Sequence, residues 1–88
     1  ERLKKPPREY FKMLYADTAL NGDVGATICG HAYFGTARCL FATDAPFDSE
    51  KGWGLIAGTI AAVNALDISP AEREQIFSGN ARALLKLA

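Results

Sequence analysis

Residues 38–47 decide the fold of this chain and read RCLFATDAPF. The first part, residues 38–43, is mostly apolar and lacks the alternation of a half-exposed strand. This pattern is typical of a strand covered on both faces, as in a parallel sheet. Asp44 ends the run, and Ala45-Pro46-Phe47 opens a loop that extends to about Gly52. The stretch therefore predicts a buried parallel strand with a carboxylate directly after it.

A second strand is predicted over residues 10–16, which read YFKMLYA and end at Asp17-Thr18. The aromatic content of this run favours a strand. Residues 1–9 are expected to form a solvated connecting loop, because Pro6-Pro7 is incompatible with a regular helix or a central strand. This loop carries a cluster of basic residues, namely Arg2, Lys4, Lys5 and Arg8.

Helices are predicted over residues 23–34, 53–66, 70–78 and 81–87. The third has a sharp start, since Ser69 can cap it, Pro70 occupies its first turn and Glu72 completes a capping box. Asn80 can cap the last helix, after a stop at Ser78-Gly79. Strands that alternate with helices in this way imply parallel strands joined by helical crossovers.

The alternation also predicts where a site lies and that more strands are needed. Two buried parallel strands would each keep a bare edge with unpaired backbone groups. Further strands must come from the remainder of a barrel or open sheet, or from other chains. Ligands of such sheets bind at the carboxyl ends of the strands. Both predicted strands end in an aspartate there, Asp17 and Asp44.

The composition excludes several classes of protein. The chain has 88 residues, 49% of them hydrophobic, and equal numbers of acidic and basic residues. It shows neither the basic stripe of a nucleic-acid-binding protein nor the long apolar run of a membrane span. The two cysteines, Cys29 and Cys39, do not make a disulfide framework. We therefore expect a cytoplasmic protein without nucleic-acid or membrane partners.

Three segments resemble the C-terminal end of the amidohydrolase-related family. They are LYADTAL (14–20), CLFATDAPF (39–47) and SPAEREQIFSGNARALL (69–85). The family branch is the one that includes aminocarboxymuconate-semialdehyde decarboxylase and related decarboxylases and hydrolases. The likeness runs from about Tyr10 to Leu87, and its most specific pieces are residues 43–47 and Gly79-Asn80-Ala81.

The resemblance implies an α/β fold, the C-terminal part of a (β/α)₈ barrel, with the two strands as the seventh and eighth. It implies that Asp44 binds a catalytic divalent metal ion, usually zinc, and helps to move protons. Phe47 matches a position that lines the substrate pocket in some members, and Asp17 could support the metal site. The implied function is that of a metal-dependent lyase or hydrolase of a small carboxylated or cyclic substrate. We expect the full-length protein to be a homo-oligomer.

The sequence departs from the family in its histidines. The family's His-x-His pair and its further histidine ligands are absent, and the single histidine, His31, lies in a predicted helix. The chain alone therefore cannot build the metal site and is expected to be inactive by itself. Either the rest of the enzyme lies outside these residues or the activity has been lost. A non-catalytic α/β module that works by association is the alternative.

Each candidate residue also has a simpler interpretation. Asp44 could merely start the turn before Pro46, and Asp17 could bond nearby backbone amides. Trp53 is expected to anchor its helix by packing, although it could instead form a pocket wall with Phe47. A metal site of His31 with the two cysteines is disfavoured, because their spacing is not that of a structural zinc site.

Overall fold

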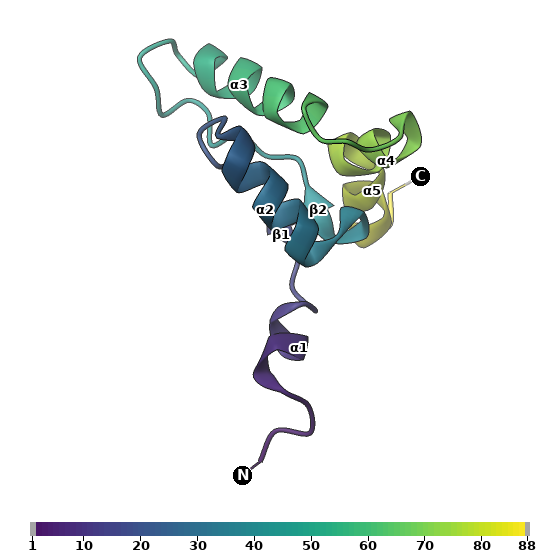
Figure 1. Ribbon diagram of the computed structural model, residues 1–88. Coiled ribbons are helices and arrows are strands. Elements are labelled where there is room, and N and C mark those ends of the chain that lie inside the picture. The colour runs from purple at the N-terminus through teal and green to yellow at the C-terminus, as the bar shows by residue number, and fades with distance from the viewer. Residues whose placement is uncertain (1, 88) are drawn as a thin grey trace.

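The computed structural model describes residues 2–87 and has a two-stranded parallel sheet at its centre (Figure 1). Strand β1 (Ala16–Asp17) pairs with β2 (Cys39–Leu40), with Ala16 opposite Cys39 and Asp17 opposite Leu40. Helix α2 (Val24–Phe34) and the short 3₁₀ helix η1 (Thr36–Arg38) connect the strands. The predicted parallel pair with a helical crossover is confirmed, although both strands are shorter than predicted.

The predicted strand over residues 10–16 is wrong for most of its length. Residues Pro7–Phe11 form helix α1, and the bonds Lys12 N–H to Arg8 O (3.1 Å) and Met13 N–H to Tyr10 O (3.0 Å) continue its turn. The expectation of a loop over residues 1–9 is wrong from Pro7 onward. A proline is tolerated in the first turn of a helix, where its missing N–H would have no partner, so Pro7 starts the helix instead of preventing it.

The turn from β1 into α2 is built by Asn21 and Gly22, which both have positive φ angles. The N–H of Asp23 closes it on the carbonyl of Leu20 (3.0 Å), and the Asp23 carboxylate then caps the helix. A Cβ atom added to Gly22 would lie 3.2 Å from backbone atoms of Gly58. Helix α3 (Trp53–Asn64) therefore approaches this turn as closely as its small residues allow.

The C-terminal part is one continuous helical segment rather than two helices. It consists of α4 (Pro70–Glu74), the π-helical turn η2 (Gln75–Gly79) and α5 (Asn80–Leu84). The predicted capping box of Ser69 and Glu72 is confirmed. The predicted stop at Ser78-Gly79 and the cap at Asn80 are wrong, because Gly79 has helical dihedral angles. Asn80 is a buried residue within the continuous helical segment, and its side-chain amide donates to backbone carbonyls of η1 and β2.

The core is small and lies between the sheet, the end of α3 and η2. Its buried members are Cys39, Val63, Leu66 and Ile76, and Phe41, Ile68 and Phe77 pack against it. Burial raises the pKa of the Cys39 thiol, which keeps this free cysteine protonated and unreactive. A core of this size leaves much apolar surface elsewhere.

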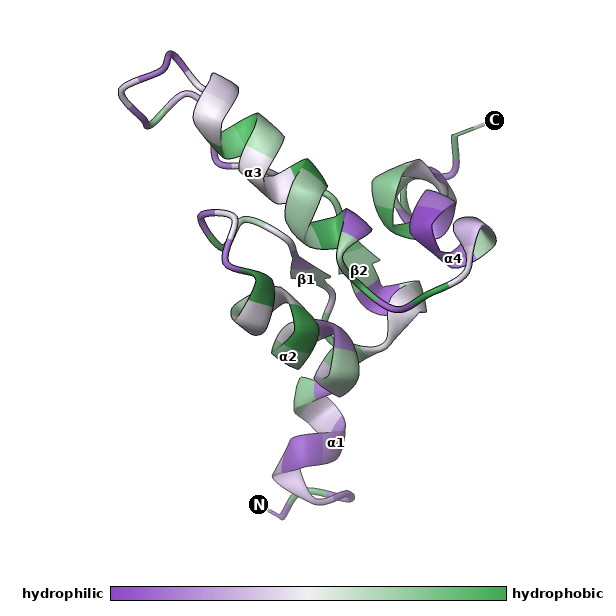
Figure 2. Ribbon diagram, turned by 45° about the horizontal axis from the view of Figure 1, so that its top comes forward, coloured by the Kyte–Doolittle hydropathy of each residue, from purple (hydrophilic) through white to green (hydrophobic). Residues whose placement is uncertain are grey.

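Many large apolar side chains are exposed, on α1, α2 and α5 and in the loops. Figure 2 shows strongly apolar residues on the visible faces of α2 and α3. Extended apolar exposure is typical of surfaces that pack against further protein. The exposed residues include Phe11, Met13, Leu14, Val24, Ile28, Leu84, Leu85 and Leu87.

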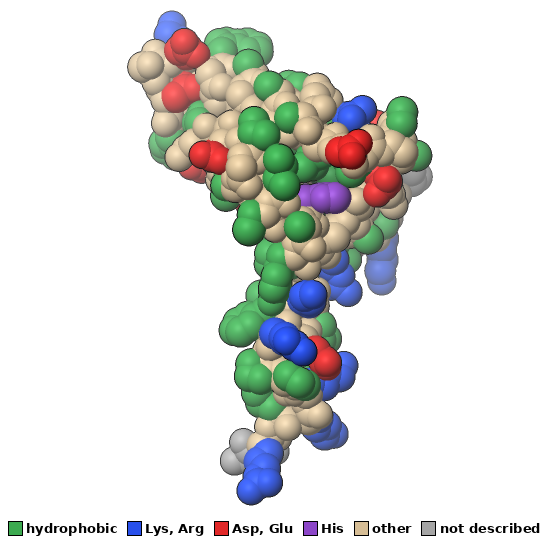
Figure 3. Space-filling model, in the orientation of Figure 1, with side chains coloured by type: hydrophobic (Ala, Val, Ile, Leu, Met, Phe, Trp, Pro, Cys, Tyr) green, Lys and Arg blue, Asp and Glu red, His purple; other side chains and the backbone are tan. Residues whose placement is uncertain are grey.

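Helix α1 projects from the body of the molecule as an arm (Figure 1). Basic side chains gather on this arm, whereas most of the visible acidic side chains are spread over the body of the molecule (Figure 3). The arm is tied to the body by Tyr33, whose hydroxyl donates to the Arg8 carbonyl, and by Arg38, whose guanidinium lies 4.9 Å from the centre of the Tyr15 ring. Within residues 2–87, no helix has the length and apolar character needed to cross a bilayer.

Replacing Thr59 with valine is expected to stabilise the protein. Thr59 is fully buried on α3, and its hydroxyl has no hydrogen-bond partner among the described residues. Valine has the same shape and removes the unpaired group, so the free energy of unfolding of the complete protein should rise by about 1 kcal/mol. Denaturant unfolding measures this change. Thr27→Val is the control, because the Thr27 hydroxyl donates to the Asp23 carbonyl and its loss should be destabilising. A destabilised Thr59→Val variant would contradict the assignment.

Candidate functional site

The strand that leads to Asp44 is held on one side by the C-terminal helical segment. The buried amide of Asn80 donates to the carbonyls of Thr36 (2.6 Å) and Cys39 (3.0 Å). The N–H of Phe41 donates to the carbonyl of Ile76 in η2 (3.1 Å). These bonds satisfy two backbone groups at the start of the strand segment, the Cys39 carbonyl and the Phe41 N–H, on the side that faces away from β1.

The other side of the strand is held by Thr18, directly after β1. The N–H of Thr18 donates to the carbonyl of Leu40 (3.0 Å). Its hydroxyl donates to the carbonyl of Ala42 (2.9 Å) and accepts the N–H of Ala42 (3.0 Å). Pairing between the two strand segments therefore continues two residues beyond β2 and ends two residues before Asp44.

Asp44 is exposed and has a φ angle of 64°. Aspartate visits this left-handed region more readily than most residues. Its backbone carbonyl accepts the N–H of Phe47 (3.4 Å), but its carboxylate forms no hydrogen bond with the residues that the structure describes. The turn before Pro46 is thus made by the backbone and by the Thr43 hydroxyl, which accepts the N–H of Ala45 (3.2 Å). The Asp44 side chain takes no part in it and is available to another partner.

Asp48 orders the loop between Asp44 and α3. Its carboxylate accepts the N–H groups of Glu50 (3.1 Å), Gly52 and Leu55 (2.8 Å). It thereby caps α3 from outside the helix, where an anion is favoured by the unpaired amides. The Gly52 amide, followed by those of Leu55 and Glu50, lowers the pKa of Asp48 below the usual value of an aspartate.

The contribution of Asp48 to stability should depend on pH. The amides stabilise the carboxylate form, so the contribution is complete above the ordinary pKa of an aspartate. It is lost as the pH falls through the lowered pKa of Asp48. In thermal melts of the complete protein, the difference between wild type and Asp48→Asn should shrink on acidification. Glu50→Gln is the control, since it removes a carboxylate of the same loop that accepts none of these three amides. A difference that grows toward low pH would contradict this role.

Asp17 lies at the end of β1, as predicted, and its carboxylate accepts the N–H of Ala19 (3.0 Å). This bond agrees with the simpler interpretation of Asp17, in which its carboxylate bonds to a nearby backbone amide. Support of a metal site by Asp17 stays a prediction.

Phe47 and Trp53 flank the loop and are highly exposed, at 80% and 70%. Trp53 starts α3, but the expectation that it anchors this helix by packing is wrong within the described residues. A role of Phe47 in substrate binding stays a prediction.

His31 lies on α2 and joins that helix to α4. Its Nε2 lies 2.8 Å from the hydroxyl of Thr36, which donates to the Glu72 carboxylate (3.0 Å). The Ser69 amide, together with the Thr36 hydroxyl, lowers the pKa of Glu72. This arrangement connects two helices. It engages His31 in a contact between α2 and α4 and does not place it at the end of a strand, where the ligands of a barrel metal site would lie.

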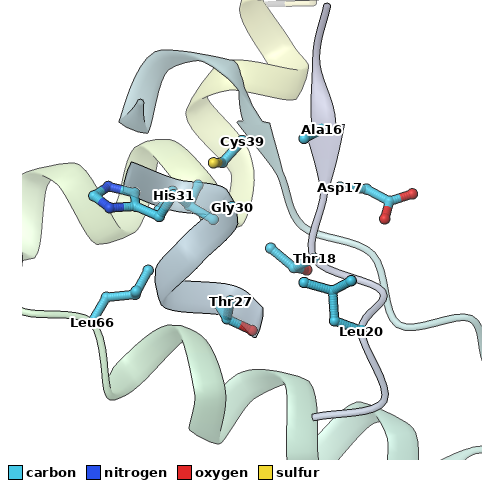
Figure 4. A pocket seen from close by; sticks show the side chains of 10 residues that line it. Ala16, Asp17, Thr18, Leu20, Thr27, Gly30, His31, Cys39 and Leu66 are labelled. Atoms are coloured by element: carbon cyan, nitrogen blue, oxygen red, sulfur yellow. The ribbon is translucent and has the colours of Figure 1, made fainter. Parts of the chain in front are cut away.

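A cavity of about 20 Å³ lies between α2 and the sheet, lined by side chains that include His31, Cys39 and Leu66. Figure 4 shows the imidazole of His31 and the carboxylate of Asp17 pointing away from each other. The volume suffices for about one water molecule. This cavity is a gap in the packing and is too small for an organic substrate.

Asp44 fits a divalent cation as one ligand, since its carboxylate oxygens are exposed and uncommitted. It cannot hold the ion alone. No cluster of three His, Cys, Asp or Glu side chains with metal-binding geometry occurs among residues 2–87. The remaining ligands would have to come from other segments.

A family model described as amidohydrolase matches residues 2–87. The chain belongs to the amidohydrolase family. A crystal structure of 2,6-dihydroxybenzoate decarboxylase, solved in complex with 2,6-dihydroxybenzoate, has a similar fold, with a TM-score of 0.74 and 30% sequence identity. The match covers 96% of this amidohydrolase chain and 24% of the decarboxylase chain. No match was found among the curated proteins. The chain thus spans about a quarter of the solved enzyme and fits part of its fold.

Three residues of the site region were missed or misjudged from the amidohydrolase sequence. Thr18 and Asn80 hold the strand before Asp44, and Asp48 caps α3. The position of Asp48 ahead of a predicted helix start was a usable signal. The partners of Thr18 and Asn80 lie at least 24 residues away in sequence, so no local pattern indicates them.

Proposed function

We propose that this chain supplies the seventh and eighth strand–helix units, with the terminal helix, of a (β/α)₈ barrel enzyme. Three findings support this placement: the parallel β–α–β unit, the 24% share of the decarboxylase chain that it matches, and the exposed apolar side chains. The missing strands and helices would cover these side chains. The complete protein, rather than this segment alone, would then carry the activity.

We further propose that Asp44 is a ligand of a divalent metal ion, zinc in the first instance. The observation that carries this proposal is the free carboxylate of Asp44, which lies two residues beyond a strand segment that is anchored from both sides. The carboxylates of Asp17, Asp23 and Asp48 are bonded to local amides instead. When bound, the metal ion would polarise the substrate or lower the pKa of a water molecule. Asp44 would hold one side of the ion and accept or return a proton at its second carboxylate oxygen.

The proposed reaction is decarboxylation of a small carboxylated aromatic acid. The support is the matched enzyme, a decarboxylase solved with a dihydroxybenzoate, at 30% identity. A carboxylated aromatic substrate needs cationic or metal contacts for its carboxylate and a flat apolar wall for its ring. The exposed ring of Phe47, three residues after Asp44, is placed to provide part of that wall.

Carbon dioxide release by the complete protein tests this function. The purified protein is incubated with 2,6-dihydroxybenzoate and with other hydroxybenzoates, before and after treatment with a chelator. We expect release from at least one of these acids, loss of release after chelation and recovery on addition of Zn²⁺. A lactone panel measures hydrolysis in parallel. A protein that binds no metal ion and releases no carbon dioxide would support the association module instead.

A further inference from the structure

We infer that Thr18 is a positioning residue for Asp44, acting through the backbone of Ala42. This inference rests on the proposed role of Asp44 in metal binding. In this role Thr18 would touch neither the metal ion nor the substrate. Its hydroxyl fixes the chain segment from which the Asp44 carboxylate projects.

The contacts of Thr18 are unusual for a side chain, because one hydroxyl satisfies both polar groups of one distant residue. Thr18 is 6% exposed, and its hydroxyl donates to the Ala42 carbonyl (2.9 Å) while accepting the Ala42 N–H (3.0 Å). A neighbouring strand would normally supply these bonds from its backbone. Here β1 has ended at Asp17, and the Thr18 side chain takes over the pairing.

Both bonds act directly on the path to Asp44. The N–H and the carbonyl of Ala42 belong to the two peptide planes on either side of this residue. Holding both groups fixes the direction in which the chain leaves toward Thr43 and Asp44. Replacing Thr18 with valine would keep the shape of the side chain but remove the hydrogen bonds that hold the two peptide planes of Ala42.

Thr27 provides a matched control for this effect. It is 5% exposed, and its hydroxyl also bonds to a backbone carbonyl, that of Asp23 (2.8 Å). It lies on α2 and has no contact with the strand segment before Asp44 among its hydrogen bonds. The same substitution at Thr27 therefore measures the loss of a buried hydroxyl without the loss of the Ala42 contacts.

The test is a Zn²⁺ titration of the complete protein against a competing chelator, with a thermal melt of each variant. Thr18→Val is expected to weaken Zn²⁺ binding at least about tenfold, the usual scale for residues that orient a metal ligand. Thr18→Ser keeps the hydroxyl and should bind Zn²⁺ within about threefold of wild type. Thr27→Val should do the same, even where it lowers the melting temperature. Equal weakening by Thr18→Val and Thr27→Val would overturn the inference.

Two further variants keep the test decisive. If Thr18→Val does not fold, Thr18→Ala removes the hydroxyl without adding a metal-binding group. Zn²⁺ binding should then weaken in the order threonine, serine, alanine, and an alanine variant equal to wild type would overturn the inference. Asp44→Asn separates the two proposals. If that variant loses Zn²⁺ and Thr18→Val does not, Asp44 is a ligand and the role of Thr18 is wrong. If Asp44→Asn binds Zn²⁺ normally, the proposed function itself fails.

Discussion

Replacing Asp44 with asparagine is expected to abolish the proposed metal binding by the complete protein and to lower kcat/KM for the proposed reaction on the order of 10³-fold. The amide keeps the size of the side chain but loses the negative charge and the proton-accepting oxygen. Asparagine is preferable to alanine here because the φ angle of residue 44 is 64°, a region that asparagine tolerates and alanine does not. A changed activity then reports on the carboxylate rather than on the backbone.

The matched control is Asp67→Asn. Asp67 is also exposed, lies just beyond α3, and its carboxylate has no hydrogen bond with the described residues. Metal content by elemental analysis and kcat/KM are measured for both variants. The Asp67 variant should retain both values. Full metal content in the Asp44 variant would show that the free carboxylate has another purpose.

Replacing Asn80 with aspartate is expected to lower the free energy of unfolding by about 3 kcal/mol or more, the largest loss of stability among the substitutions proposed here. The Asn80 amide is buried and donates to the carbonyls of Thr36 and Cys39. An aspartate at this position would bring a negative charge against two carbonyl oxygens and could donate to neither. The loss should appear in the denaturant midpoint and the melting temperature of the complete protein.

Asn64→Asp makes the same chemical change at an exposed position at the end of α3. Its cost should stay below about 1 kcal/mol, the scale of a charge near a helix terminus. The comparison isolates the buried contacts of Asn80 from the effect of the added charge. Similar losses in the two variants would mean that the Asn80 contacts contribute little.

The features that sequence predicted well are those that depend on short-range chemistry. The run over 38–43 identified a parallel strand because an apolar segment without alternation fits a strand buried on both faces. Ser69 and Glu72 identified a helix start because the capping box is contained within four residues. Gly35, with a φ angle of 83°, ended α2 where the sequence placed its stop.

The features that sequence missed depend on contacts between distant segments. The aromatic run after Pro7 favoured a strand, but no neighbouring strand pairs with it within the described residues, and the local helical bonds prevail. Asn80 looked like a helix cap, yet its amide is used by carbonyls 41 and 44 residues earlier in the chain. The sequence placed Thr18 at the end of a predicted strand but did not indicate its bonds to Ala42, which lies 24 residues later in the chain. Each of these roles is visible only once the chain has folded.

We propose that the Asp44 carboxylate binds a divalent cation together with ligands from the rest of the barrel. Anomalous diffraction from crystals of the complete protein grown with Zn²⁺ tests it most directly. We expect a zinc peak at about 2.0–2.2 Å from an Asp44 carboxylate oxygen, with histidines of other strands completing the coordination. A zinc ion bound elsewhere, with the Asp44 side chain turned into solvent, would contradict it.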